Sequence, residues 1–164
     1  VQTCALPISY DAWRSKAKRG IPARSDIDPA ELSFALGSVS LMDVLRDPLR
    51  FRVRLIGSNI QARFPVDLKG IYIDRFPEPE NARLFDAVYR GVLETRQPQD
   101  FVGSCVEDGE RRLYRARIWP LASDGQEIDM LLCCRESPGQ QEALKPDTAS
   151  GWRASLLHMG TPSP

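Results

Sequence analysis

Two aspartates placed two residues apart, Asp26 and Asp28, are the first side chains whose spacing suggests chemistry. A pair of carboxylates can act as general acid and general base when a pocket separates their pKa values. No neighbouring segment supplies such a pocket, and Arg24 and Pro29 fit a stiff connector instead. Asp28 directly before Pro29 is typical of a helix N-cap. We therefore expect both aspartates to hold backbone in place rather than to catalyse a reaction.

The other residues with catalytic potential are few. The one histidine, His158, lies near the C-terminus, so the central part of the chain has no imidazole to act as base or ligand. The four cysteines, at positions 4, 105, 133 and 134, form no CxxC pair, which argues against a zinc site. We predict that Cys105 and Cys134 are small buried residues with reduced thiols, as in a cytoplasmic protein. We expect no catalytic residue, no metal site and no enzymatic activity.

Length, composition and charge limit the class of protein. The 164 residues correspond to about one domain, and 42% hydrophobic with 27% charged residues is ordinary for a globular chain. Lys+Arg and Asp+Glu are 22 each, whereas binding to a phosphate backbone needs an excess of positive charge. No apolar stretch approaches the roughly 18 residues that span a bilayer. We expect neither nucleic acid nor a membrane as a partner.

The two ends of the chain differ from its middle. Residues 1–8 begin without methionine and fit no element, so we interpret them as a sequencing or cloning scar. Residues 137–164 are rich in proline, glycine and polar residues, which predicts a flexible C-terminal tail. The predicted domain is therefore 9–136.

Within this domain the elements follow in a clear order. Apolar spacing and stop signals predict helices over 10–19, 30–36 and 79–95, and a short helical stretch capped by Ser58 or Asn59. Alternation and turn signals predict strands over 38–46, 50–56, 99–107, 110–119 and 127–135. This order is typical of an α+β domain: a five-stranded antiparallel sheet with helices on one face and an N-terminal helix.

Strand alternation also predicts which residues face the core. Phe51, Val53 and Leu55 share a face of the second strand, and we expect Leu55 and Ile118 to be buried against the helix over 79–95. Tyr114 shares the face of Ile118 on the fourth strand.

The opposite face of the sheet is predicted to be partly apolar. We assign to it Leu113 and Trp119 of the fourth strand, and Leu131 and Cys133 of the fifth. Exposed apolar patches usually mark an interface, and two-fold symmetry is the commonest way to bury one. We therefore expect a homodimer through this face and the N-terminal helix that carries Trp13; the alternative is that this helix seals its own sheet.

Three motifs add a resemblance. Trp13 lies in the first predicted helix, the connector over 22–29 reads Pro-Ala-Arg-Ser-Asp-Ile-Asp-Pro, and the second strand ends in Arg-Leu-Ile-Gly-Ser over 54–58. With the order of elements, the chain resembles the PAS fold and is similar to a bacterial family of short, stand-alone PAS-type domains. The motif residues, to which we assign a structural role, are Trp13, Pro22, Arg24, Asp26, Asp28, Pro29, Arg54 and Gly57.

The resemblance implies a sensory or regulatory module that binds a small molecule, a signalling partner, or both. The polar-tipped residues that we place near a ligand pocket are Asn59, Tyr72, Tyr89 and Tyr114. No cofactor is identified by any motif. A second interpretation is an interaction or dimerisation module with a filled core and no ligand. A cavity of a few hundred cubic ångströms would favour the first interpretation.

Overall fold

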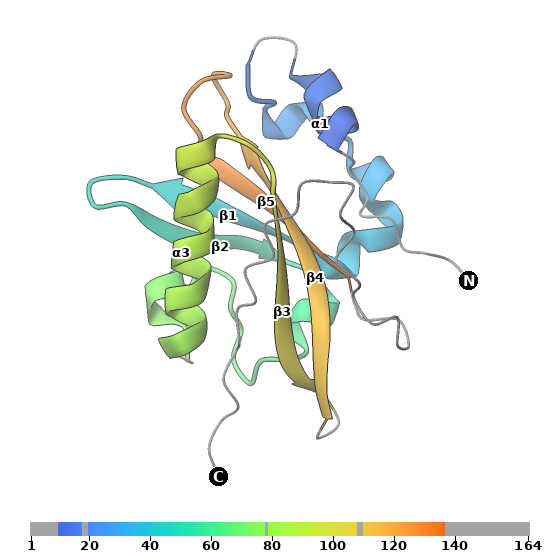
Figure 1. The fold of residues 1–164 in the computed structure, drawn as a ribbon, viewed down its shortest axis with the longest axis vertical. Helices are drawn as coiled ribbons and strands as arrows, with labels where there is room; N and C mark the ends of the chain where they lie inside the picture. Colours follow the sequence, from blue (N-terminus) through green and yellow to red (C-terminus); the bar gives the residue numbers. More distant parts are fainter. Residues whose placement is uncertain (1–9, 18–19, 78, 108–109, 137–164) are drawn as a thin grey trace.

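A computed structural model describes residues 10–17, 20–77, 79–107 and 110–136 (Figure 1). Some sequence predictions lie outside the described residues. They concern the scar at 1–8, the tail at 137–164 with His158, and the side chains of Cys105 and Leu113.

Five strands form one antiparallel sheet, as predicted. They are β1 (Val39–Leu45), β2 (Arg50–Ile56), β3 (Gln99–Glu107), β4 (Glu110–Leu121) and β5 (Met130–Glu136). Their order across the sheet is β2-β1-β5-β4-β3. Pairing of β1 with β5 therefore joins the β1–β2 hairpin to the three consecutive strands β3, β4 and β5 in one sheet.

Helices lie on both sides of this sheet (Figure 1). The long helix α3 (Pro79–Thr95), with the bounds expected from its sequence, packs on the face that we call the inner face. The N-terminal elements α1 (Tyr10–Lys16), η1 (Arg24–Asp26) and η2 (Pro29–Ser38) lie on the opposite, outer face. Two short elements, α2 (Ser58–Gln61) and η3 (Ile73–Arg75), connect β2 to α3. Gly57 is the N-cap of α2 without a side-chain hydrogen bond, so the prediction that Ser58 or Asn59 caps it is wrong.

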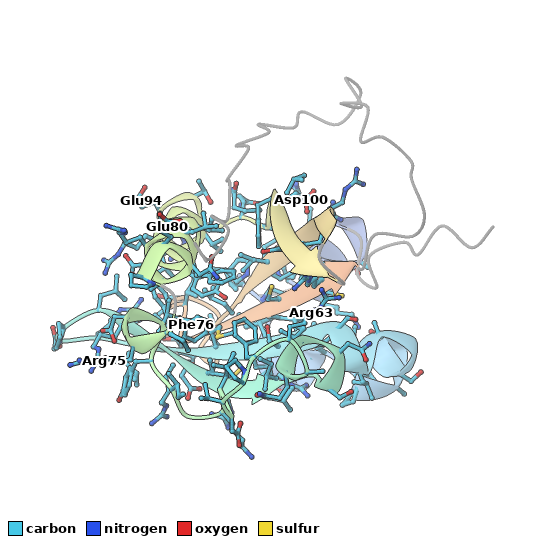
Figure 2. All side chains as sticks on the ribbon, turned by 90° about the horizontal axis from the view of Figure 1, so that it is seen from below. Arg63, Arg75, Phe76, Glu80, Glu94 and Asp100 are labelled. Carbon is cyan, nitrogen blue, oxygen red and sulfur yellow. The ribbon has the colours of Figure 1, made fainter. Side chains whose placement is uncertain are left out.

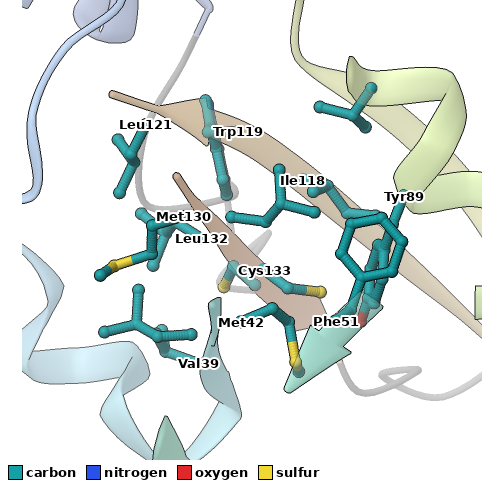
Figure 3. Packing of buried hydrophobic residues seen from close by; sticks show 14 of the residues in the cluster. Val39, Met42, Phe51, Tyr89, Ile118, Trp119, Leu121, Met130, Leu132 and Cys133 are labelled. Carbon is teal, nitrogen blue, oxygen red and sulfur yellow. The ribbon is translucent and has the colours of Figure 1, made fainter. Parts of the chain in front are cut away.

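Strand register decides which side chains share a face, because residues directly opposite in an antiparallel pair point the same way. Cys133 is opposite Ile118 and Ser40, on the inner face, and Leu131 is opposite Met42 there. Figure 3 shows Cys133 and Met42 on the side of Tyr89 and α3. The assignment of Leu131 and Cys133 to the outer face is therefore wrong. The run from Met130 to Cys134 is entirely apolar, so its sequence has no alternation to indicate a face.

A β-bulge interrupts the alternation of β2. Met42 is opposite Val53 and Leu41 is opposite Leu55, which leaves Arg54 as an extra residue on β2. The bulge turns Leu55 to the outer face, where 45% of the residue is exposed, so its predicted burial against α3 is wrong. Val53 stays buried, and Ile118 on β4 is fully buried as predicted.

The N-terminal elements cover the outer face of their own sheet. The indole Nε1 of Trp13 donates a hydrogen bond to the carbonyl oxygen of Pro120 at 3.1 Å, and Trp13 is 4% exposed. The Ile21 amide donates to Gly125 O, and the carbonyl of Pro22 accepts from the Ala122 amide, each at 2.9 Å. Helix α1 therefore seals its own sheet, which is the alternative to the predicted use of this helix in a dimer interface.

The connector over 22–29 is held by its own polar side chains. Asp26 Oδ2 accepts from the Ala23 amide, and Asp28 Oδ1 accepts from the Ala30 amide, both at 2.8 Å. Arg24 donates to the carbonyl of Ile27 at 2.9 Å. Pro29 is the first residue of η2, a 3-10 helix where the sequence predicted a helix over 30–36. These contacts fix the backbone of the connector and the start of η2, which is a structural role; we call this arrangement the clasp.

Replacing the cap tests this clasp. An Asp28→Ala variant is expected to lose about 0.5–2 kcal/mol of unfolding free energy, because the Ala30 amide loses its acceptor. Urea denaturation measures the change, and Asp28→Asn, which keeps a side-chain acceptor, is the matched control. Equal losses in the two variants would mean that the carboxylate acts through its charge rather than as a cap.

Candidate functional site

Six aromatic side chains form a connected cluster between α3 and the inner face of the sheet, and Phe64 extends it through a contact with Phe76 at 6.1 Å between ring centroids. Tyr89 meets Phe51 edge-on at 5.2 Å between ring centroids and stacks on Phe85 at 6.0 Å. Phe85 contacts Phe101 at 6.4 Å, and Phe101 contacts Tyr114 at 5.9 Å. We call this set the aromatic cluster; its members are Phe51, Phe76, Phe85, Tyr89, Phe101 and Tyr114.

The hydroxyl of Tyr89 is the polar group of the aromatic cluster that lies near Cys133. The residue is 2% exposed, and burial raises the pKa of its hydroxyl well above the ordinary value, with smaller contributions from Cys133 and Tyr114. The hydroxyl therefore stays protonated at physiological pH. It makes no hydrogen bond with any residue in the part of the chain that the structure describes. Figure 3 shows Tyr89 beside Phe51, with Cys133 and Ile118 close by.

Cys133 is a buried thiol on the same inner face. Burial raises its pKa to about 11, although a hydrogen bond with Ser40 partly offsets the effect. Because the thiolate is the nucleophile, Cys133 is an inert polar neighbour of Tyr89 near neutral pH. Cys134 points to the outer face and is 2% exposed, which confirms its predicted burial.

Tyr114 marks the other end of the aromatic cluster. The guanidinium carbon of Arg135 lies 3.7 Å from the centroid of its ring. On the neighbouring strand, Gly103 is so close that an added Cβ would be 2.5 Å from the Tyr114 hydroxyl. The ring of Tyr114 therefore lies between the guanidinium of Arg135 and the backbone of Gly103. The arrangement offers apolar surface with a few polar tips, which suits binding better than catalysis.

The four predicted pocket residues do not come together. Tyr89 and Tyr114 lie in the aromatic cluster, whereas Tyr72 lies beside β2, with the guanidinium of Arg50 at 3.7 Å from its ring centroid. Asn59 is exposed and donates to the hydroxyl of Ser38 at 3.4 Å. A ligand-binding role for these residues stays a prediction.

The sequence did not place three residues of this region in the site: Phe85 of α3, and Cys133 and Arg135 of β5. The spacing of Phe85 and Tyr89, four residues apart on one helix, was a usable signal. The approach of Arg135 to Tyr114 had no local signal, because it depends on the pairing of β4 with β5.

The remaining motif residues, Arg54 and Gly57, have structural contacts. Arg54 Nη1 lies 3.2 Å from Asp43 Oδ1, and Arg52 Nη2 lies 2.8 Å from Asp43 Oδ2. The two arginines thus satisfy a carboxylate that is largely buried on the outer face. The Gly57 amide donates to the carbonyl of Val39 at 2.7 Å, which joins the end of β2 to the start of β1.

No group of three or more His, Cys, Asp or Glu side chains among the described residues is placed to hold a metal ion. No helix in the described ranges is long and apolar enough to cross a membrane.

Comparison with known families decides the classification. A model of the PAS domain family, PAS_5, matches residues 3–134. The chain belongs to the PAS domain family. PAS domains are in general sensory and regulatory modules, and membership of this family supports such a role for this chain. None of the curated proteins matches it.

Solved PAS domains include structures similar to this one. The PAS domain of the histidine kinase ThkA is 14% identical, with a TM-score of 0.43 over 60% of this chain and 98% of that one. A sensory box sensor histidine kinase from Vibrio cholerae is 17% identical, with a TM-score of 0.46 over 69% and 90%. A fungal LOV domain photoreceptor is 13% identical, with a TM-score of 0.42 over 70% and 94%.

Proposed function

We propose that this PAS domain works in the cytoplasm as a sensor of a small, mostly apolar molecule. The molecule binds between α3 and the inner face of the sheet, against the aromatic cluster. Occupancy of this site then changes the interaction of the domain with a signalling partner. The aromatic rings supply the apolar surface that small-molecule sites use, and Tyr89, Tyr114 and Cys133 supply a few polar groups.

The Tyr89 hydroxyl carries this proposal. Tyr89 is 2% exposed and has no hydrogen bond to any described residue, so its hydroxyl has donor capacity that a ligand can use. A ligand that presents an acceptor atom to this hydroxyl gains a hydrogen bond worth about 0.5–1.5 kcal/mol. The ligand class that fits is therefore an apolar molecule with one hydrogen-bonding group.

Native mass spectrometry of the purified protein tests the proposal. We expect a mass above that of the chain, and the extra mass to be released on denaturation. A Tyr89→Phe variant is expected to retain less ligand while its unliganded form keeps or gains stability, because an unpaired hydroxyl is removed. Tyr72→Phe removes a hydroxyl outside the aromatic cluster and is the matched control.

Two outcomes would contradict this proposal. One is a protein that carries no ligand and shows no thermal shift with any member of a metabolite library, which favours a module with a filled core. The other is a bound ligand that Tyr89→Phe retains fully, which shows that the ligand does not bind at the Tyr89 hydroxyl.

The second candidate function is an interaction module that forms a homodimer. Leu55 is 45% exposed on the outer face, beside Arg54. Arg117 on the same face is paired with Asp100, so its charge is already neutralised. Light scattering at micromolar concentration tests this candidate: a dimer that Leu55→Glu dissociates supports it, and a monomeric intact chain refutes it.

A further inference from the structure

A groove of about 520 Å³ lies between α3 and the hairpin that joins β1 to β2. Its apolar lining comes from Leu49, Phe76, Pro79 and Ala82. Figure 2 shows Phe76 on the α3 side of the molecule. The volume is within the range of about 300–1,000 Å³ that small-molecule sites occupy.

One wall of the groove is held by a paired arginine. Arg50 donates from Nε and Nη2 to the two carboxylate oxygens of Asp74, each at 2.7 Å, and its guanidinium stacks on Tyr72. The hydrogen bond from Arg50 lowers the pKa of Asp74. The charge of Arg50 is therefore already compensated.

The opposite wall, on α3, is held in the same way. Arg90 Nε donates to Asp86 at 2.6 Å, and its Nη2 reaches the carbonyl of Leu49 at 3.4 Å. Arg90 thus ties α3 to the hairpin and sets the width of the groove. The side chains of both walls are held in place without a ligand. Binding therefore loses less side-chain conformational entropy.

Arg83 differs from the other two arginines of the groove. It is exposed on α3 and makes no ion pair or hydrogen bond with any residue within the described ranges. Among the described residues that line the groove there are three arginines and two aspartates, and Arg83 is the arginine without a carboxylate partner there. Its charge lies beside an apolar floor.

We propose that this groove binds a small organic anion, independently of any ligand on the inner face. The carboxylate pairs with Arg83, and the apolar body lies against Leu49, Phe76 and Ala82. A guanidinium is well suited to a carboxylate because its planar donors bind both oxygens. The groove thereby gives the domain a second ligand-binding site, between α3 and the β1–β2 hairpin.

Phenylacetate is the probe for this site, with 2-phenylethanol and phenethylamine as neutral and cationic analogues. In an amide NMR titration, phenylacetate is expected to saturate and to shift signals over 49–50, 74–76 and 79–90. Arg83→Gln should weaken its binding about tenfold or more, as expected for a hydrogen bond to a charged group. Lys69→Gln also removes one exposed positive charge, but outside the groove, and is expected to bind phenylacetate like the unchanged protein.

Three results would overturn the proposal. The neutral alcohol binds as tightly as the anion, Arg83→Gln leaves the affinity unchanged, or the shifts are confined to Phe101, Tyr114 and Cys133, which lie on the inner face of the sheet and do not line the groove. Because Arg83 does not contact the aromatic cluster through any described interaction, failure here leaves the inner-face proposal standing.

Discussion

An Ile118→Ala variant is expected to lose about 2–5 kcal/mol of unfolding free energy. Ile118 is fully buried on the inner face, opposite Cys133, so the truncation leaves a cavity in close-packed surroundings. Urea denaturation followed by far-UV circular dichroism gives the value directly. A loss below about 1 kcal/mol would contradict the placement of Ile118 in the core.

Leu55→Ala is the matched control for this prediction. The residue is equally apolar, but the bulge at Arg54 leaves it 45% exposed on the outer face. Exposed substitutions usually change stability by less than about 0.5–1 kcal/mol. Similar losses for Leu55→Ala and Ile118→Ala would show that β2 has no bulge in solution.

A Gly57→Ala variant is expected to be destabilised by about 1–3 kcal/mol or more. An added Cβ would lie 2.5 Å from the carbonyl oxygen of Leu36 and still closer to that of Gly37. All three of the nearest atoms belong to backbone, so one of the two chain segments has to move. Thermal and urea denaturation both report this change.

Gly37→Ala is the control on the other side of the same contact. Its added Cβ would meet the amide of Asn59, whose Nδ2 is 2.6 Å away. Asn59 is exposed and can rotate, at the expense of a 3.4 Å hydrogen bond to Ser38. We expect a loss of less than about 1 kcal/mol. If Gly37→Ala destabilises as much as Gly57→Ala, the close approach of η2 to the start of α2 at Gly57 is not the cause.

Several elements were predictable because their signals are local. Helix α3 begins at Pro79 and β3 spans Gln99–Glu107 as expected, since a proline at the first turn and alternating side chains need no distant partner. The cap at Asp28 was equally readable, because acceptor and amide are two residues apart. Local signals were weaker at β5, which begins at Met130 rather than at 127.

The candidate site was predictable only in part. Tyr89 and Tyr114 were singled out as polar tips on apolar surfaces, and they lie in one aromatic cluster. Tyr72 and Asn59 satisfied the same description but lie elsewhere, because residue type does not say where a connecting segment turns.

The sequence by itself determined the order of helices and strands, the cap of η2, the burial of Ile118 and the membership in the α+β class. These follow from periodicity, turn chemistry and the hydrophobic effect, which act over a few residues. Only the tertiary structure decided the face of Cys133, the outward turn of Leu55 and the docking of Trp13 on its own sheet. Each depends on strand register or on a choice between equivalent apolar surfaces, and that choice is made by contacts between segments far apart in the chain.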